Sequence, residues 1–174
     1  MDPLARIGNA SWLDDPDGRE EAVSALESGR VLYIPDLSFP VEEQETRFFE
    51  DDLLHLSSKN VSYDPSTNAV RGLESTGGAT DEDRAALGHM MARYAQFCQD
   101  LCASLLGDYA KRLNSARTSF RPVEIEGRKS RTVGSDDTLL HVDSFSSRPT
   151  AGRRIMRVFT NVSPVGKPRV WNVG

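Results

Sequence analysis

The chain has 174 residues, of which 38% are hydrophobic and 27% charged, and its formal net charge is −5. These values are typical of an ordinary globular protein. The length fits one domain, residues 1–174, and argues against two. No apolar run reaches the length of a membrane-spanning helix, and the first residues do not form a signal peptide, so we expect a cytoplasmic protein.

Charge is distributed unevenly along the chain. Residues 1–110 contain 8 Lys and Arg against 21 Asp and Glu (−13), whereas residues 111–174 contain 13 against 5 (+8). An arginine-rich segment suits an anionic ligand, because guanidinium binds carboxylate and phosphate through paired hydrogen bonds. A solvated, basic sheet edge explains the same composition. Nucleic acid is not expected, since the sequence has neither a recognition-helix pattern nor interleaved aromatic residues for stacking.

The first part of the chain, residues 1–116, is expected to be mainly helical. In chain order we predict an irregular arm (1–18), a helix (19–28), a short buried strand (30–34), a helix (42–56), a polar loop (59–78), and a long helix from residue 80 with a shorter piece reaching residue 113. In the first helix Ala22, Val23 and Leu26 recur at helical spacing, and Gly29 follows where a helix C′ residue is favoured.

The clearest helical signal begins at Thr80. Thr80 and Asp83 resemble a capping box with Asp in place of Glu, and acidic residues suit the positive end of the helix dipole. A broad apolar stripe follows over residues 87–106. Cys98 and Cys102 share this face, and we interpret them as structural thiols, because two Cys without further Cys or a nearby His make a poor zinc site.

From residue 117 the pattern changes to strands. We predict strands at residues 118–125, 139–145, 154–162 and 169–173, with a turn at 163–168. Helices followed by strands predict an α+β fold, in which residues 117–174 supply the first strands of a sheet.

The stretch that points to chemistry is His141-Val142-Asp143. On a strand, alternate side chains share a face, so His141 and Asp143 point together. An imidazole and a carboxylate so placed supply two ligands of the 2-His-1-carboxylate triad found in non-haem Fe(II) oxygenases. A buried, hydrogen-bonded pair without a metal is the structural alternative. The order of elements, with this strand opening the sheet, is that of a double-stranded β-helix oxygenase, a jelly-roll barrel with its metal in the mouth.

Several stretches together resemble one family, the 3-deoxy-D-manno-oct-2-ulosonic acid (Kdo) hydroxylases. They are Asp136–Thr150, Gly152–Val162, Pro168–Trp171, Lys59–Asp64 and Thr118–Glu124. The resemblance implies an Fe(II)- and 2-oxoglutarate-dependent dioxygenase that hydroxylates Kdo at C3 in the lipopolysaccharide inner core of Gram-negative bacteria, giving Ko. It implies His141 and Asp143 as catalytic iron ligands. Kdo-lipid A, O2 and a peripheral contact with the inner membrane are the implied partners.

The resemblance also implies a second His far downstream and an Arg for the distal carboxylate of 2-oxoglutarate. No His follows His141, and His55 and His89 lie upstream on helical stretches. Too few strands follow His141 to close a barrel. We therefore expect a jelly roll that is incomplete in this chain, an N-terminal portion of a longer protein or one completed by a second segment. The alternative is a non-catalytic module that binds an anionic sugar or lipid A.

Candidate substrate-binding residues are basic or amide side chains around these stretches: Lys59, Asn60, Arg121, Arg148, Arg153 and Arg157. Arginine suits the anionic groups of such a substrate and co-substrate. Ordinary surface charge or a structural role accounts for each residue equally well.

Overall fold

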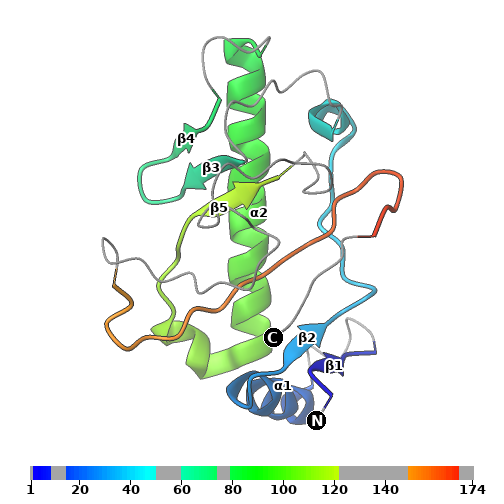
Figure 1. The fold of residues 1–174 in the computed structure, drawn as a ribbon, viewed down its shortest axis with the longest axis vertical. Coiled ribbons are helices and arrows are strands. Elements are labelled where there is room, and N and C mark those ends of the chain that lie inside the picture. Colours follow the sequence, from blue (N-terminus) through cyan, green and yellow to red (C-terminus); the bar gives the residue numbers. More distant parts are fainter. Residues whose placement is uncertain (1, 9–14, 50–59, 74–78, 122–148, 169–174) are drawn as a thin grey trace, which may run out of the picture.

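The computed structural model describes residues 2–8, 15–49, 60–73, 79–121 and 149–168 (Figure 1). Its helices are α1 (Pro16–Glu27), α2 (Asp81–Leu106) and the 3-10 helices η2 (Glu43–Phe49) and η3 (Gly107–Arg112). Its strands are β1 (Leu4–Arg6), β2 (Val31–Tyr33), β3 (Val61–Asp64), β4 (Ala69–Arg71) and β5 (Thr118–Phe120). The described part therefore mixes helix and sheet, as the sequence predicts.

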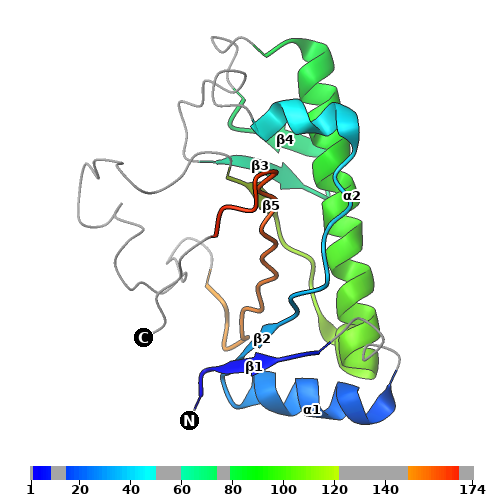
Figure 2. The same cartoon turned by 90° about the vertical axis from the view of Figure 1, so that its right-hand side faces the viewer.

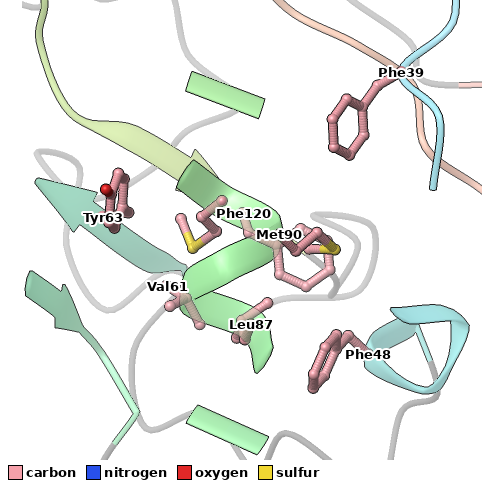
Figure 3. Packing of buried hydrophobic residues seen from close by; sticks show 8 residues of the cluster. Phe39, Phe48, Val61, Tyr63, Leu87, Met90 and Phe120 are labelled. Atoms are coloured by element: carbon pink, nitrogen blue, oxygen red, sulfur yellow. The ribbon is translucent and has the colours of Figure 1, made fainter. Parts of the chain in front are cut away.

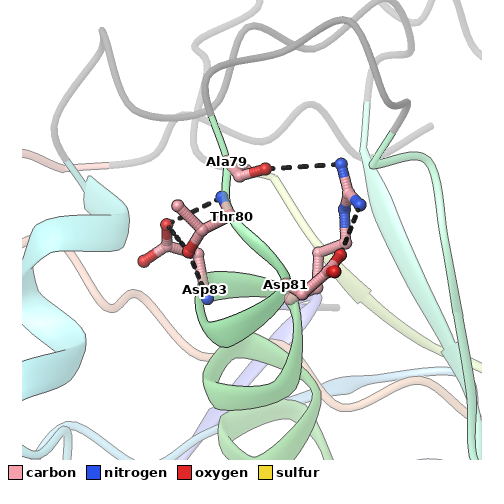
Figure 4. Close-up of polar contacts among 5 residues, drawn as sticks. Ala79, Thr80, Asp81 and Asp83 are labelled. Carbon is pink, nitrogen blue, oxygen red and sulfur yellow. Dashed lines mark hydrogen bonds and ion pairs between the residues drawn. The ribbon is translucent and has the colours of Figure 1, made fainter.

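Helix α2, 26 residues long, is the axis on which the other elements pack. Its start has the predicted capping box: Thr80 Oγ1 accepts a bond from the Asp83 N–H at 3.1 Å, and Asp83 Oδ2 accepts one from the Thr80 N–H at 3.0 Å (Figure 4). The helix ends at Gly107, whose φ of +53° favours glycine. The predicted long helix is confirmed, and the shorter piece after it is η3.

Two groups of buried side chains lie at different heights along α2. The first joins α2 to β3, β5, η2 and the chain before η2, and contains Phe39, Phe48, Val61, Tyr63, Leu87, Met90, Met91 and Phe120 (Figure 3). The second joins the C-terminal end of α2 to α1 and the end of β1, and contains Ile7, Ala22, Leu105 and Leu106. Figure 2 shows α1, β1 and β2 at one end of the molecule and β3, β4 and β5 further along α2.

Strands β4, β3 and β5 form an antiparallel sheet in that order, with Tyr63 opposite Val70 and Val61 opposite Phe120. The prediction of a loop over residues 59–78 is therefore wrong within residues 61–71. These strands have three or four residues each, too few to show an alternating pattern in a polar stretch. The turn between β3 and β4 is held by Asn68, which has a φ of +53° and accepts a bond from the Tyr63 hydroxyl at 2.9 Å.

Strands β1 and β2 form a separate parallel pair, with Leu4 opposite Val31. Arg30 supports the pairing by donating to the Leu4 carbonyl at 2.8 Å. The prediction of an irregular arm over residues 1–18 is wrong at β1, because the strand depends on a partner that lies far along the chain. The helix predicted at 19–28 is α1, which begins earlier because Asp15 caps it and Pro16 suits its first position.

The remaining predictions have mixed outcomes. The strands predicted at 30–34 and 118–125 correspond to β2 and β5, with residues 122–125 outside the described part. The burial predicted for the first strand is wrong, because Val31 and Tyr33 are 47% and 46% exposed. The helix predicted at 42–56 is a 3-10 helix over residues 43–49, and residues 50–56 lie outside the described part. The strand predicted at 154–162 makes no pairing with the strands of the described part. The turn after it is confirmed, with the Gly166 N–H donating to the Ser163 carbonyl at 3.2 Å.

Candidate functional site

The two predicted iron ligands, His141 and Asp143, lie outside the described residues, as do Lys59 and Arg148. Their placement therefore stays a prediction. The four other candidates, Asn60, Arg121, Arg153 and Arg157, are described. They fall into two groups on different parts of the fold.

Asn60 and Arg121 belong to the three-stranded sheet. Asn60 comes directly before β3 and Arg121 directly after β5, and the two strands run antiparallel with Val61 opposite Phe120. Both residues therefore leave the sheet at the same end. The Asn60 side-chain amide donates to Ser119 Oγ at 3.4 Å, while Arg121 is exposed. Strand pairing thus brings together two candidates that are 61 positions apart in the sequence.

Arg153 and Arg157 lie on the extended segment 153–162. The Arg153 N–H closes a turn by donating to the Thr150 carbonyl at 2.9 Å, and the next residue, Arg154, forms an ion pair of 2.6 Å with Glu27 of α1. This turn, in orange, lies near the α1 end of the molecule (Figure 2). Both candidate arginines are exposed. The structure does not place Arg153 beside Asn60 and Arg121, which lie further along α2.

The described residues contain no group of three His, Cys, Asp or Glu side chains that could hold a metal ion. His89 is exposed on α2, and His55 lies outside the described part. Burial raises the pKa of the Cys98 thiol to about 11 and also raises that of Cys102. Both thiols therefore stay protonated near neutral pH, which fits the structural role predicted for them.

A polar groove that the sequence did not predict lies beside the β3–β4 turn. It has a volume of about 600 Å³ and is lined by Asp64, Pro65, Ser66, Gln99, Ser115, Ala116 and Arg117. Hydrogen bonds from the Ser66 hydroxyl and N–H, and then Arg117 at 3.4 Å, lower the pKa of Asp64. Gln99 donates to Ser115 Oγ at 3.2 Å. The groove walls come from the β3–β4 turn, from α2 and from the chain directly before β5, which only the tertiary structure brings together.

Comparison with known proteins gives a consistent result. The family model for 3-deoxy-D-manno-oct-2-ulosonic acid (Kdo) hydroxylase matches residues 9–174. The crystal structure of the Kdo hydroxylase KdoO, a non-haem Fe(II) alpha-ketoglutarate-dependent dioxygenase, in complex with cobalt(II) is 40% identical, with a TM-score of 0.84. That match covers 96% of this chain and 55% of KdoO.

A second KdoO structure, in complex with alpha-ketoglutarate and Fe(III), is also 40% identical, with a TM-score of 0.83 over 96% of this chain and 54% of KdoO. No curated protein matches the chain. The chain thus spans about half the length of the KdoO structures that it matches. With a family match that covers nearly all of its residues, the chain belongs to the Kdo hydroxylase family.

Proposed function

We propose that this chain is part of an Fe(II)- and 2-oxoglutarate-dependent dioxygenase that hydroxylates Kdo at C3 in Kdo-lipid A, with O2 as the other co-substrate. The observation that carries the proposal is the match to KdoO in complex with alpha-ketoglutarate and Fe(III), at 40% identity over 96% of this chain. At that identity the fold and the type of site are expected to be shared, whereas a likeness of fold alone would not carry the chemistry.

His141 and Asp143 are the residues that would hold the iron. Their donor set fits Fe(II), because an imidazole nitrogen and a carboxylate oxygen two residues apart match two positions of the facial triad. When bound, the metal supplies the oxidative chemistry of the family. The chain itself would contribute the two ligands. Asn60 and Arg121 would contribute polar groups at the end that β3 and β5 share.

The basic second part of the chain supports an anionic substrate and co-substrate. Residues 111–174 carry a formal charge of +8, from 13 Lys and Arg against 5 Asp and Glu. Arg121, Arg148, Arg153 and Arg157, with Lys59, would contact carboxylate or phosphate groups of Kdo-lipid A. Such a lipid substrate would bring the protein to the inner-membrane surface as a peripheral visitor. No helix among the described residues is long and apolar enough to span a membrane.

For the fold, the proposal is a single domain in which residues 1–116 pack on a double-stranded β-helix begun by residues 117–174. A second candidate function is a binding module without catalysis, which would bind the sugar or lipid A through its arginines. The formal charge of +8 over residues 111–174 suits an anionic ligand in this case too.

An anaerobic titration with Fe(II) and 2-oxoglutarate separates the two functions. We would follow the charge-transfer absorbance of the iron chelate in this chain, in Asp143→Ala and in the control Asp137→Ala, which removes a carboxylate outside the His-X-Asp triplet. The dioxygenase proposal expects a band that Asp143→Ala abolishes and Asp137→Ala keeps. A band that survives Asp143→Ala would contradict the dioxygenase proposal. The absence of a band in both this chain and a longer form would also contradict it and favour the binding module.

A further inference from the structure

The polar groove beside the β3–β4 turn is built from three separate parts of the chain. The end of β3 and the turn after it contribute residues 64–66, α2 contributes Gln99, and the chain that enters β5 contributes residues 115–117. Figure 1 shows this last stretch and the β3–β4 turn on the same side of α2. Because β3 and β5 run antiparallel, the groove lies at the sheet end opposite to Asn60 and Arg121. Its volume of about 600 Å³ is within the range of small-molecule sites.

Hydrogen bonds hold the polar groups of the groove in place. The Asp64 carboxylate accepts from the Ser66 hydroxyl at 2.6 Å and from the Ser66 N–H at 3.1 Å, and Arg117 Nε donates to its other oxygen at 3.4 Å. Gln99 donates to Ser115 Oγ at 3.2 Å, which ties the chain before β5 to the helix. Because these groups are already ordered, little free energy is lost in arranging them around a ligand.

The same groups keep donors and acceptors for a ligand. Among the residues that the structure describes, the Arg117 guanidinium bonds only to Asp64 and only through Nε, so its two terminal nitrogens remain as donors. The Gln99 amide oxygen accepts no bond within the described part of the chain. The Ser115 hydroxyl accepts from Gln99 and keeps its own proton to donate. The groove therefore offers hydrogen-bond donors and acceptors together.

We propose that this groove binds an uncharged sugar, a pyranose ring whose adjacent hydroxyls both donate and accept hydrogen bonds. Such hydroxyls can accept from Arg117 and donate to Asp64 or Gln99. Asp64 and Arg117 are the two charged residues of the lining, and their opposite charges are in contact, so the groove presents no net charge to a ligand. Pro65 and Ala116 add apolar surface for the C–H groups of the ring. This inference does not rest on the proposed function, because neither iron nor Kdo enters it.

Charged ligands fit the groove less well than a neutral sugar. An anion on the terminal nitrogens of Arg117 would lie beside the Asp64 carboxylate, which hydrogen bonds from Ser66 keep ionised by lowering its pKa. A zwitterion would have to compete with the contact of 3.4 Å between Asp64 and Arg117 for both charges. Both kinds of ligand are included as competitors in the test.

Nitrogen–proton NMR spectra of the 174-residue chain test the proposal, because the side chains of Arg117 and Gln99 carry N–H groups that report binding directly. The probes are methyl β-D-glucopyranoside and methyl α-D-mannopyranoside at neutral pH. We expect saturable shifts of both side-chain signals, with half-saturation below about 10 mM for at least one glycoside. The absence of saturable shifts with both glycosides would overturn the proposal. Glucuronate and phosphoethanolamine are the charged competitors, and tighter binding of either would assign the groove to charged ligands instead.

Gln99→Ala makes the test residue-specific. With the Arg117 Nε–H signal as the readout, this variant should bind the glycoside roughly fivefold more weakly, as expected for the loss of one neutral hydrogen bond. Alanine suits the helix, so the fold should be kept. Gln96→Ala is the matched control, because Gln96 is exposed on the same helix and donates to Asp100 at 2.8 Å outside the groove. The control should bind as the unmodified chain does, and equal affinities in the two variants would show that the groove is not the sugar site.

Octyl β-D-glucopyranoside, used below its micelle concentration, identifies the source of the sugar ring. An affinity equal to that of methyl β-D-glucopyranoside would indicate a free sugar or a soluble glycan. Binding that is tighter by roughly tenfold or more would indicate the sugar ring of a glycolipid, because the alkyl chain then buries apolar surface as well. Both results support the groove as a sugar site. Failure of the iron titration would leave all of these outcomes unaffected.

Discussion

The hydroxyl of Tyr94 donates a hydrogen bond of 3.0 Å to Thr160 Oγ1, which joins the middle of α2 to a segment 66 residues further along the chain. The Tyr94 ring also meets Phe39 edge to face, with centroids 5.2 Å apart. Burial raises the pKa of Tyr94 well above its ordinary range, so the hydroxyl stays a donor. This contact positions the segment that carries Arg153 and Arg157.

Tyr94→Phe should lower the free energy of unfolding by about 1 kcal/mol, because it removes one half-buried hydrogen bond and keeps the ring. Urea denaturation measures the loss. Tyr109→Phe is the matched control, since Tyr109 is 44% exposed and its hydroxyl donates to Glu27 at 2.8 Å in contact with solvent. That control should change stability by less than about 0.5 kcal/mol. Equal losses in the two variants would contradict the role assigned to Tyr94.

Arg93 fixes the start of η2 to α2. Its guanidinium lies 2.6 Å from Glu42 and 2.9 Å from Glu45, donates to the Pro40 carbonyl, and stacks over Phe39. Glu45 is only 3% exposed, so its carboxylate depends on this cation. The Glu45 carboxylate also accepts from the Glu42 N–H at 2.8 Å. The group is therefore a nearly closed polar network beside the core.

Arg93→Met should destabilise the protein by about 3 kcal/mol, because it leaves the buried Glu45 carboxylate without its counter-charge. Lys111→Met is the control, since Lys111 and Asp108 form an ion pair with side chains 77% and 92% exposed, which contributes well under about 1 kcal/mol. Thermal unfolding compares the two variants. Adding Glu45→Gln to Arg93→Met should restore part of the loss, and failure to do so would show that the buried charge is not the cause.

Asp83 makes the cap of α2 sensitive to pH. Hydrogen bonds from the Thr80 hydroxyl and N–H, with Arg47 at 3.1 Å, lower its pKa below the ordinary 3.8. Because the folded pKa is lower than the unfolded pKa, this stabilisation is present above about pH 4 and is lost as the pH falls through the folded pKa.

Asp83→Asn should therefore flatten the fall in unfolding free energy that the unmodified chain shows as the pH decreases below 4. Urea denaturation at a series of acidic pH values measures the slope. Asp81→Asn, which changes a carboxylate that is 99% exposed, should keep the original slope. If Asp83→Asn also keeps it, the capping-box carboxylate does not titrate differently in the folded and unfolded chains.

Arg121→Gln tests whether the sheet end that carries Asn60 and Arg121 binds an anionic ligand. Loss of an arginine that pairs with a carboxylate should weaken binding of 2-oxoglutarate or Kdo by roughly tenfold. Arg112→Gln, at the exposed end of η3, is the control and should bind as the unmodified chain does. Isothermal titration calorimetry measures both. Equal affinity in the two variants would assign Arg121 to ordinary surface charge.

Features that depend on residues close together in the sequence were predicted, whereas features that depend on distant residues were not. Helix α2 and its cap at Thr80 and Asp83 were predicted correctly, because capping and amphipathic spacing are local. The pairing of Leu4 with Val31 was missed, because a three-residue strand is too short to show its own pattern and its partner lies far along the chain. In the segment predicted as a strand at 154–162, exposed and half-buried residues alternate only over 157–162, and the segment pairs with neither sheet of the described part.

The sequence by itself determined the family and the candidate iron ligands, because the His141-Val142-Asp143 triplet and the stretches around it consist of consecutive residues. The family comparison confirms the resemblance. The positions of the two ligands remain predictions. Only the tertiary structure decided that Asn60 and Arg121 share one sheet end and that Tyr94 holds the segment of Arg153 and Arg157. These relations depend on pairing and packing between residues distant in the chain, which local patterns do not encode.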